Sequence, residues 1–375
     1  MDIVQIGVCH GEKINFMDQV HDSMRARCER YVQKSGGPYT LYREKNGKTP
    51  IQYLEEAFKP LQKYKNQIGM VIDGSTTRGF TEPSQASLYA QHLKLTNAIC
   101  FDVVEACNGF SRALETAYMV FQTQKKFDDQ YILIINNEQP PETRAVLPKD
   151  DSDYRLVASY YVGLTFSNVC TCTLIKKSNN NSWNFQHHTN TNTASHINIP
   201  LPKLAKGFLP HTDDYEVILN EQYGQYCLPR LHQVDTKIPF VFGHIEAMES
   251  YYKEANLICH TFSKTVYETM FANHEIGKLS LYYDSCGNLG SCSLPFILHD
   301  QYGSVLPKNE KLAWLGNAAG GSDYMLTFQP WSNEEKKEYK VRGKYITWIT
   351  LGYRVLKNKL LCSKRKNKKV GLKSQ

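Results

Sequence analysis

The sequence predicts an α/β fold with a mainly parallel sheet, on three observations. Short apolar segments alternate with segments of helical periodicity, the order typical of β-α-β units. The 375 residues allow a large core, and a hydrophobic content of 41% with 22% charged residues is ordinary for a globular protein. An apolar strand, a reactive residue and a helix follow one another in both halves, at Cys107 and at His260. This repetition indicates a duplicated architecture with the functional site at the seam.

The N-terminal part alternates predicted strands and helices, with a Gly-, Ser- and Thr-rich loop over residues 73–84. Strand-like apolar runs and runs with helical spacing come in this order: strand Ile3 to Val8, helix Met17 to Gln33, helix Pro50 to Tyr64, strand Ile68 to Ile72, helix Gln85 to Leu93, strand Phe101 to Ala106 and strand Tyr131 to Ile135.

The C-terminal part contains longer polar segments. The predicted elements are a strand at Val169 to Ile175, a polar loop or hairpin over 176–198, helices around 215–219 and 246–254, a strand at Asn256 to Cys259 and a helix at Phe262 to Phe271. His187, His188 and His196 lie in the polar segment. Because no carboxylate or cysteine stands at ligand spacing, an exposed loop is predicted there and no metal site.

The cysteines and the N-terminus predict a cytoplasmic protein. Eleven cysteines, an odd number, argue against a disulfide framework, and their spacing lacks the paired C-x-x-C of a zinc site. The start, MDIVQIGVCHGEKI, does not have the pattern of a secretory signal. No run of 18 apolar residues predicts a transmembrane helix.

The positive charge is concentrated at the C-terminal end. Residues 331–375 hold 14 Lys and Arg against 3 Glu, a net +11, so of the overall +7 the other 330 residues carry −4. The basic pI therefore gives no reason to expect nucleic-acid binding by the globular part. Apolar residues over 345–361 followed by the basic cluster could contact an anionic membrane surface or an acidic carrier protein, or could form a plain surface element with a solubilising tail.

Cys107 is the residue most suggestive of chemistry. In FDVVEACNGFSRALETAYMVF, residues 101–121, it stands between a strand and a helix, with Asn108 and Gly109 allowing a sharp turn. A cysteine is by type usually a small buried hydrophobic residue. At the start of a helix, however, the helix dipole favours the thiolate, which is the nucleophilic form. The context therefore predicts a nucleophile.

Two further segments belong with Cys107. His260 stands in ICHTFS, residues 258–263, and Asn288 in GNLGSCSLP, residues 287–295. In order and approximate spacing, the three segments resemble the thiolase superfamily, above all the 3-ketoacyl-acyl-carrier-protein synthase III group. That group carries A-C-x-G-F, H-Q-A-N and G-N-T-S-A-A-S-x-P in this order, and the resemblance covers roughly residues 1–330.

The resemblance implies a thiolase-like fold, a duplicated five-layer αβαβα architecture with a basic C-terminal extension. Its halves would be residues 1–165, with the nucleophile, and 166–330, with the His and the Asn, followed by the extension at 331–375. It implies acyl transfer to Cys107, then decarboxylative Claisen condensation with a malonyl thioester, in which His260 and Asn288 hydrogen-bond the thioester carbonyl. The oxyanion hole would combine the Cys107 amide with that of Gly320 or Gly321.

Several positions depart from the family pattern. Ser263, preceded by Phe262, stands where the family has an Asn that helps to hold the pantetheine arm; both are predicted substrate-binding residues. The aromatic-Arg-Arg segment that grips coenzyme A is not recognisable near residues 25–50. These departures point away from housekeeping fatty-acid initiation and towards a specialised fatty-acid or polyketide pathway. No bound cofactor is expected; acyl-CoA or acyl-carrier-protein thioesters would be substrates.

Related enzymes of this fold provide the alternatives. Hydroxymethylglutaryl-CoA synthases also carry E-A-C, as at residues 105–107, but need an acid in a loop that here reads GSTT, residues 74–77. Thiolases proper need a second cysteine in C-x-G, which has no match. A non-elongating acyltransferase to an alcohol or amine, with His260 as general base, remains possible, as does a non-catalytic subunit paired with an active homologue. A homodimer or heterodimer, and contact with an acyl carrier protein, are expected from the resemblance.

Overall fold

The computed structural model describes residues 1–140, 154–191, 197–198, 228–229, 239–303, 305–319 and 321–331. By its internal contacts the chain forms one compact unit, Met1–Gln329, and a second, Pro330–Gln375. The predicted helix at 215–219, His196, Gly320 and nearly all of the basic extension lie outside the described residues. The predicted boundary between residues 165 and 166 stays a prediction.

The first sheet has five strands in the order β1-β7-β6-β4-β5. They are β1 (Asp2–His10), β4 (Ile68–Asp73), β5 (Ile99–Asp102), β6 (Tyr131–Glu138) and β7 (Val169–Lys176). The strands β4, β5 and β6 run parallel, whereas β7 pairs antiparallel with both β1 and β6. All six residues of β4 and all eight of β6 are buried, as expected for central strands covered on both faces.

The second sheet also has five strands, in the order β12-β11-β13-β14-β8. They are β8 (Asn181–Thr189), β11 (Asn256–Cys259), β12 (Lys278–Ser280), β13 (Leu312–Ala318) and β14 (Ser322–Pro330). The pairs of β11 with β12 and β13 are parallel, and β13 forms an antiparallel hairpin with β14.

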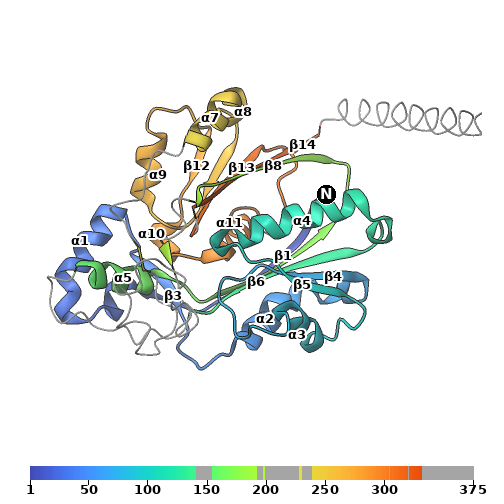
Figure 1. The fold of residues 1–375 in the computed structure, drawn as a ribbon, viewed down its shortest axis with the longest axis horizontal. Coiled ribbons are helices and arrows are strands. Elements are labelled where there is room, and N and C mark those ends of the chain that lie inside the picture. The colour runs from blue at the N-terminus through green and yellow to red at the C-terminus, as the bar shows by residue number, and fades with distance from the viewer. Residues whose placement is uncertain are drawn as a thin grey trace, which may run out of the picture. The chain divides into compact units, whose positions relative to one another are not determined.

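Two helices pack between the sheets, α4 (Gly109–Thr123) and α11 (Ser293–Tyr302). Figure 1 shows α4 running between the two sets of strands. The largest core cluster joins Leu114 of α4 and Ile297 of α11 to Ile134 of the first sheet and Trp314 of the second. Because residues of both helices share one core with residues of both sheets, the helices form the middle layer.

Further helices cover the outer faces. On the first sheet lie α2 (Pro50–Phe58) and α3 (Gln85–His92), with a 3-10 segment at Lys59–Gln67, in a cluster that includes Leu54, Ala90 and Leu133. On the second lie α7 (Pro239–Ala247), α8 (Glu249–Tyr252) and α9 (Lys264–Phe271), which pack against Leu257 and Leu315. The layer order confirms the predicted αβαβα architecture.

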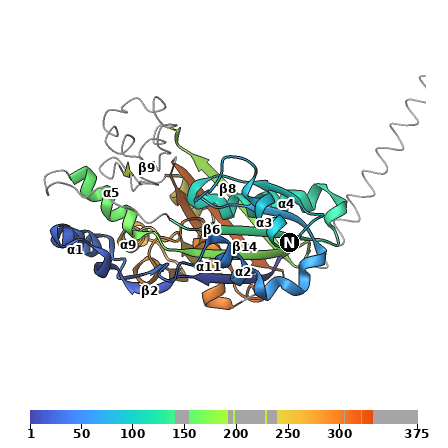
Figure 2. The ribbon, with the colours of Figure 1, turned by 90° about the horizontal axis from the view of Figure 1, so that it is seen from below.

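A smaller cluster stands at one end of the molecule. It contains α1 (Arg25–Ser35), α5 (Tyr154–Thr165) and the hairpin of β2 (Glu12–Asn15) with β3 (Thr40–Arg43). Figure 2 shows α1 and α5 side by side there. The remaining short elements are α10 (Tyr283–Cys286) and the pair of β9 (Ile197–Asn198) with β10 (Leu228–Pro229).

Some predicted elements were wrong. The sheets are mixed and not mainly parallel, because β7 and β14 enter antiparallel. The polar segment after β7 contains the strand β8, whose polar side chains face outward at the edge of the second sheet. The strand before Cys107 ends at Asp102, ahead of the predicted Ala106. The predicted helix over 17–33 is two 3-10 turns, Phe16–Gln19 and Asp22–Met24, followed by α1.

The start of α4 approaches the loop after β4 without space for a side chain. A Cβ placed on Gly109 would lie 2.0 Å from the carbonyl oxygen of Gly74. The start of α4 is therefore seated directly on the backbone of the loop after β4, through the pair Gly74 and Gly109.

We expect Gly109→Ala to lower the free energy of unfolding by about 1–3 kcal/mol, because the new methyl group must displace backbone. The sign of this change in the free energy of unfolding is informative, because alanine is otherwise a better helix former than glycine by about 1 kcal/mol. Gly79→Ala is the matched control, because a Cβ there meets nothing within 4 Å. Urea unfolding measures both, and equal stabilities of the two variants would contradict the close contact.

Candidate active site

Cys107 lies in a 3-10 turn, Ala106–Asn108, that leads directly into α4. Its side chain is half-buried. The preceding Ala106 has a φ of +43°, a left-handed conformation that costs a non-glycine residue about 1–2 kcal/mol. The N–H of Asn108 donates to the carbonyl of Glu105 at 2.9 Å and closes the turn. The thiol is therefore presented at the positive end of a 15-residue helix, as the sequence predicted.

The second half of the chain reaches Cys107 through α9. Burial raises the pKa of the Tyr267 phenol far above its ordinary value, and the nearby thiols of Cys259 and Cys107 add to the effect. The hydroxyl of Tyr267 donates to Oδ1 of Asn317 on β13 at 2.9 Å. Tyr267 is thus a neutral neighbour of Cys107, and its hydroxyl is hydrogen-bonded to Asn317 on the second sheet.

His260 follows β11 and continues the second sheet. Its backbone N–H donates to the carbonyl of Leu315 at 2.9 Å, and its side chain is 3% exposed. Burial lowers the pKa of the imidazole to about 3, so the ring is neutral at physiological pH. Its Nδ1 lies 2.9 Å from the hydroxyl oxygen of Ser293. His260 is therefore a neutral imidazole whose ring is oriented through Nδ1.

Asn288 is held on both sides of its backbone. Its N–H donates to the Thr165 carbonyl at 2.8 Å, and its carbonyl accepts from the Ser167 N–H at 2.9 Å. Its side-chain oxygen accepts from the N–H of Gly290 at 2.9 Å, which leaves Nδ2 as the donor available to a substrate. The next residue, Leu289, donates its N–H to Thr261 Oγ1 at 2.8 Å and so joins this loop to that of His260.

The three predicted catalytic segments converge on one 3-10 turn, Gly290–Cys292. The turn Ala106–Asn108, which contains Cys107, packs against it. Asn288 lies two residues before it, and Ser293, which follows it, bonds to His260. The structure therefore brings the loop of Cys107 to the loops of His260 and Asn288, which lie more than 150 residues further along the sequence.

A buried carboxylate holds the convergence turn in place. Glu138, at the end of β6 and 3% exposed, accepts from the hydroxyl of Ser291 at 2.5 Å. It also accepts from the N–H groups of Thr76 and Thr77 at 2.8 and 3.0 Å. A Cβ on Gly290 would lie 3.1 Å from this carboxyl group. Glu138 thus ties the loop after β4 to the turn before α11.

The predicted oxyanion-hole glycine lies beside the nucleophile turn. Gly321 has a φ of +71° in the turn between β13 and β14. The next residue, Ser322, accepts at its carbonyl from Nδ2 of Asn108 at 3.1 Å. Gly320 itself lies outside the described residues. The geometry places Gly321 one residue from a contact with the neighbour of Cys107.

The two predicted substrate-binding residues, Ser263 and Phe262, lie in the segment between His260 and α9. Ser263 caps the start of α9, where its hydroxyl accepts from the Val266 N–H at 3.4 Å and donates to the Ser35 carbonyl at 3.0 Å. Its one proton is therefore used within the protein. Phe262 is half-buried in the turn after His260, where its N–H donates to the His260 carbonyl at 2.8 Å.

Sequence reasoning did not identify Ser293 as a partner of His260. The hydroxyl of Ser293 also lies 2.8 Å from Thr261 Oγ1 and 2.8 Å from the Gly290 carbonyl oxygen. The Gly290 carbonyl already accepts the backbone N–H of Ser293. A carbonyl oxygen has two lone pairs, so Gly290 can also accept the Ser293 hydroxyl; if the hydroxyl donates to Nδ1 of His260 instead, the ring proton lies on Nε2. The two serines of the motif GNLGSCS were the only signal of this network in the sequence.

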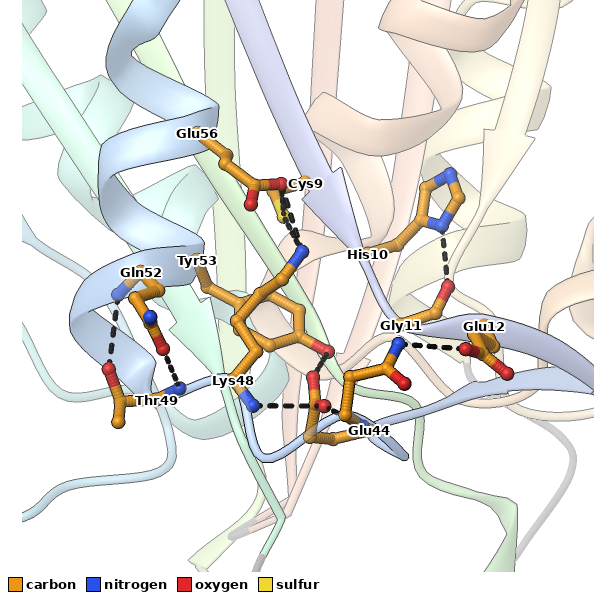
Figure 3. Close-up of polar contacts among 11 residues, drawn as sticks. Cys9, His10, Gly11, Glu12, Glu44, Lys48, Thr49, Gln52, Tyr53 and Glu56 are labelled. Carbon is orange, nitrogen blue, oxygen red and sulfur yellow. Dashed lines mark hydrogen bonds and ion pairs between the residues drawn. The ribbon is translucent and has the colours of Figure 1, made fainter.

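The environment of Cys9 favours the protonated thiol. Its thiol donates to Glu56 at 3.1 Å, and Lys48 bonds to the same carboxylate at 2.9 Å (Figure 3). Burial, followed by the hydrogen bond to Glu56 and its negative charge, raises the pKa of Cys9 to about 12. A buried thiol held beside a carboxylate stays protonated, so Cys9 is not a second nucleophile.

Among the described residues, no group of three or more His, Cys, Asp and Glu is placed to hold a metal ion. No described helix combines the length and the apolar character needed to cross a membrane.

Comparisons with known proteins agree with this geometry. No protein-family profile matches the chain. Two curated proteins named β-ketoacyl-[acyl-carrier-protein] synthase III, from Wolbachia strains of Culex pipiens and Brugia malayi, are 36% identical over 73 residues and 33% over 88 residues. These matches span only 20% and 24% of this chain, and 22% and 26% of the relatives.

Solved structures match over most of the chain. A histidine variant of OleA from Xanthomonas campestris has a TM-score of 0.67 at 16% identity, covering 88% of this chain and 98% of that one. The chain has the thiolase fold. A cysteine-to-alanine OleA variant has the same TM-score at 14% identity, covering 88% and 96%. Together, the comparisons show similarity to synthase III over about a quarter of the chain and the thiolase fold over most of it.

The buried, neutral His260 predicts a specific pH dependence of stability. Its folded-state pKa, about 3, lies below the value of about 6.5 in an unfolded chain. As the pH falls below 6.5, the unfolded chain binds a proton that folded His260 does not accept until about pH 3. This group therefore destabilises the fold progressively over that interval.

Between pH 7.5 and pH 5, the native chain should lose up to about 2 kcal/mol more of its free energy of unfolding than His260→Gln. Urea unfolding at the two pH values measures the difference. An equal loss in both proteins would show that His260 is protonated in the fold.

Proposed function

We propose that the chain is an acyltransferase of the ketosynthase type, which first accepts an acyl group on Cys107. The Cys107 thiolate attacks the carbonyl carbon of an acyl thioester, and a tetrahedral oxyanion forms. Collapse breaks the bond to the pantetheine sulfur, which leaves as a thiol with the proton that Cys107 gave up. The backbone N–H groups of Cys107 and of Gly321 or Gly320 stabilise the oxyanion.

In the second step, the acyl group is joined to a malonyl or related thioester. The bond to the malonyl carboxylate breaks, CO₂ leaves, and its electron pair forms an enolate. Nε2–H of His260 and Nδ2 of Asn288 donate to the enolate oxygen, each contributing about 2–4 kcal/mol. The enolate carbon attacks the acyl-cysteine carbonyl, and the Cys107 thiolate is expelled.

The observation that carries this proposal is the convergence of the Cys107, His260 and Asn288 loops on the turn Gly290–Cys292. A neutral imidazole is the form needed to donate to a thioester carbonyl, and the low pKa of His260 supports that form. One OleA structure, a cysteine-to-serine variant, holds lauric acid and lauroyl-CoA. This supports an acyl thioester as the donor, with no resident cofactor.

A non-elongating acyltransferase is the second candidate, and one observation favours it. The Ser293 hydroxyl also reaches the Gly290 carbonyl at 2.8 Å. If its proton goes there, His260 donates Nδ1–H to Ser293 and leaves Nε2 as a base. An alcohol or amine acceptor would then be deprotonated, and no decarboxylation would be needed.

The partners follow from the same proposal. Acyl-CoA, an acyl carrier protein or both would deliver the acyl group in a specialised lipid or polyketide pathway, and a cytoplasmic location belongs to the proposal. A dimer is supported by β5, an edge strand of the first sheet close to Cys107 in sequence. Ile99, the first residue of β5, and Val104, two residues after its end, are 44% and 65% exposed. A second copy could cover this edge.

Intact-mass spectrometry tests the acyl-transfer step. Incubation with lauroyl-CoA should add one lauroyl group to the chain, and Cys107→Ala should abolish the adduct. Cys100, which is also half-buried, is the matched control, because Cys100→Ala should leave acylation unchanged. The absence of any adduct on the native chain, across a range of acyl thioesters, would reject both enzyme hypotheses.

Asn288→Ala separates the two steps. Because Asn288 acts on the enolate and not on the acyl-cysteine, the variant should acylate near the native rate. Release of CO₂ from a malonyl thioester should fall about 100-fold, the usual effect of losing one oxyanion donor. Release of CO₂ by the variant at the native rate would show that Asn288 does not act in decarboxylation. Acylation without any CO₂ release by the native chain would favour plain acyl transfer.

A further inference from the structure

Hydrogen bonds from both sides of the nucleophile meet at Ser322. On one side, the Ser322 hydroxyl donates to Oε1 of Glu105 at 2.6 Å. On the other, Nδ2 of Asn108 donates to the Ser322 carbonyl at 3.1 Å and lies 3.4 Å from its hydroxyl. Glu105 and Asn108 flank Cys107 in the sequence, at two residues before and one after, whereas Ser322 directly follows Gly321.

Glu105 is itself fixed by the nucleophile helix. Nε of Arg112 donates to Glu105 Oε2 at 2.5 Å, and the same guanidinium reaches Glu115 at 2.7 Å. The hydroxyl of Tyr324 on β14 donates to Glu115 at 2.5 Å, and Arg112 lies 5.3 Å from the Tyr324 ring centre. The helix α4 and the strand β14 are therefore joined twice, through Ser322 and Glu105 and through Tyr324 and Glu115.

The ionised state of Glu105 strengthens its hydrogen bonds with Arg112 and Ser322. Burial alone would raise the pKa of Glu105, but the hydrogen bonds from Arg112 and Ser322 outweigh it, and the pKa is lowered. The group is ionised at neutral pH and accepts strongly. The side chains of Glu105 and Arg112 are 19% and 24% exposed, so their ion pair is less screened than a surface pair.

Two backbone features show how closely the parts fit. A Cβ on Gly316 of β13 would lie 2.1 Å from Oδ1 of Asn108, so only glycine leaves room for that side chain. The Gly321 carbonyl accepts from the N–H of Asn190, just after β8, at 2.9 Å. The Gly321 turn is therefore fixed from the side of β8 and from the side of the nucleophile.

We propose that Glu105, Asn108 and Ser322 form a clamp that sets the position of the Gly321 turn against Cys107. These are positioning residues; they act through the backbone and do not touch the substrate. The inference rests on the proposed function, because it concerns the oxyanion hole for acyl transfer. Oxyanion donors must be placed to within a fraction of an ångström, so loosening the clamp slows acylation without changing the thiol.

The test compares two reactions of Cys107 in the full chain. Acylation by lauroyl-CoA passes through an oxyanion, whereas alkylation by iodoacetamide displaces iodide at a saturated carbon and forms none. Single-turnover mass spectrometry of the Cys107 peptide follows both. Ser322→Ala and Glu105→Gln should each slow acylation about 10- to 100-fold and leave alkylation within about twofold of native.

Two further variants serve as controls. Ser322→Thr retains the hydroxyl and should restore most of the acylation rate. Thr116→Ala removes a hydroxyl that bonds to the Arg112 carbonyl at 2.8 Å within α4, and it should leave both rates unchanged. Native acylation in Ser322→Ala and Glu105→Gln would overturn the clamp. An equal loss of alkylation would also overturn it, because the thiol itself would then be affected.

Amide hydrogen exchange separates failure of the clamp from failure of the proposed function. Peptides covering residues 312–330 should exchange faster in Ser322→Ala than in the native chain, whatever the substrate. Unchanged exchange overturns the clamp. If the native chain gives no lauroyl adduct while exchange does increase, the clamp stands as a structural link and acyl transfer from this donor is rejected.

Discussion

At the end of β6, the buried carboxylate of Glu138 accepts hydrogen bonds from two loops that come from different halves of the chain. One loop follows β4 and packs on the start of α4 through Gly74 and Gly109. The other is the turn Gly290–Cys292, which positions Asn288 and Ser293. A buried ionisable group without its partners is costly, so this carboxylate stabilises one arrangement of the two loops. The positions of the nucleophile helix and of His260 both follow from that arrangement.

Two ionisable groups of the site, His260 and Glu105, respond to burial with opposite outcomes. His260 is buried beside neutral hydroxyl groups, so desolvation dominates and the imidazole stays uncharged. Glu105 is only partly buried and faces Arg112, so the ionised form is favoured despite desolvation. The neutral group is the one for which we propose a hydrogen bond to a substrate, whereas the charged pair links α4 to Ser322.

The sequence was sufficient where the signal is local. The strand at Asn256–Cys259 was predicted to the residue, and the strand–turn–helix around Cys107 was recognised from spacing and from Asn108 and Gly109. It was insufficient where the signal depends on contacts between distant residues. The strand β8 looks like a loop because its exposed face is polar, and only pairing at the edge of the second sheet makes it a strand. Ser293 and Ser322 are ordinary serines until folding places them beside His260 and Glu105, which lie 33 and 217 residues away.

The positive φ of Ala106 relates stability to reactivity. A glycine at that position would adopt the left-handed conformation without a steric penalty, and it is the substitution that a search for greater thermal stability would select. The same glycine would make the turn that carries Cys107 more flexible. The chain instead retains a residue that is less comfortable there, held in place by the packing of α4. The fold thus gives up some stability to keep the turn before Cys107 in one conformation. The most stable variants at this position therefore need not be the most active.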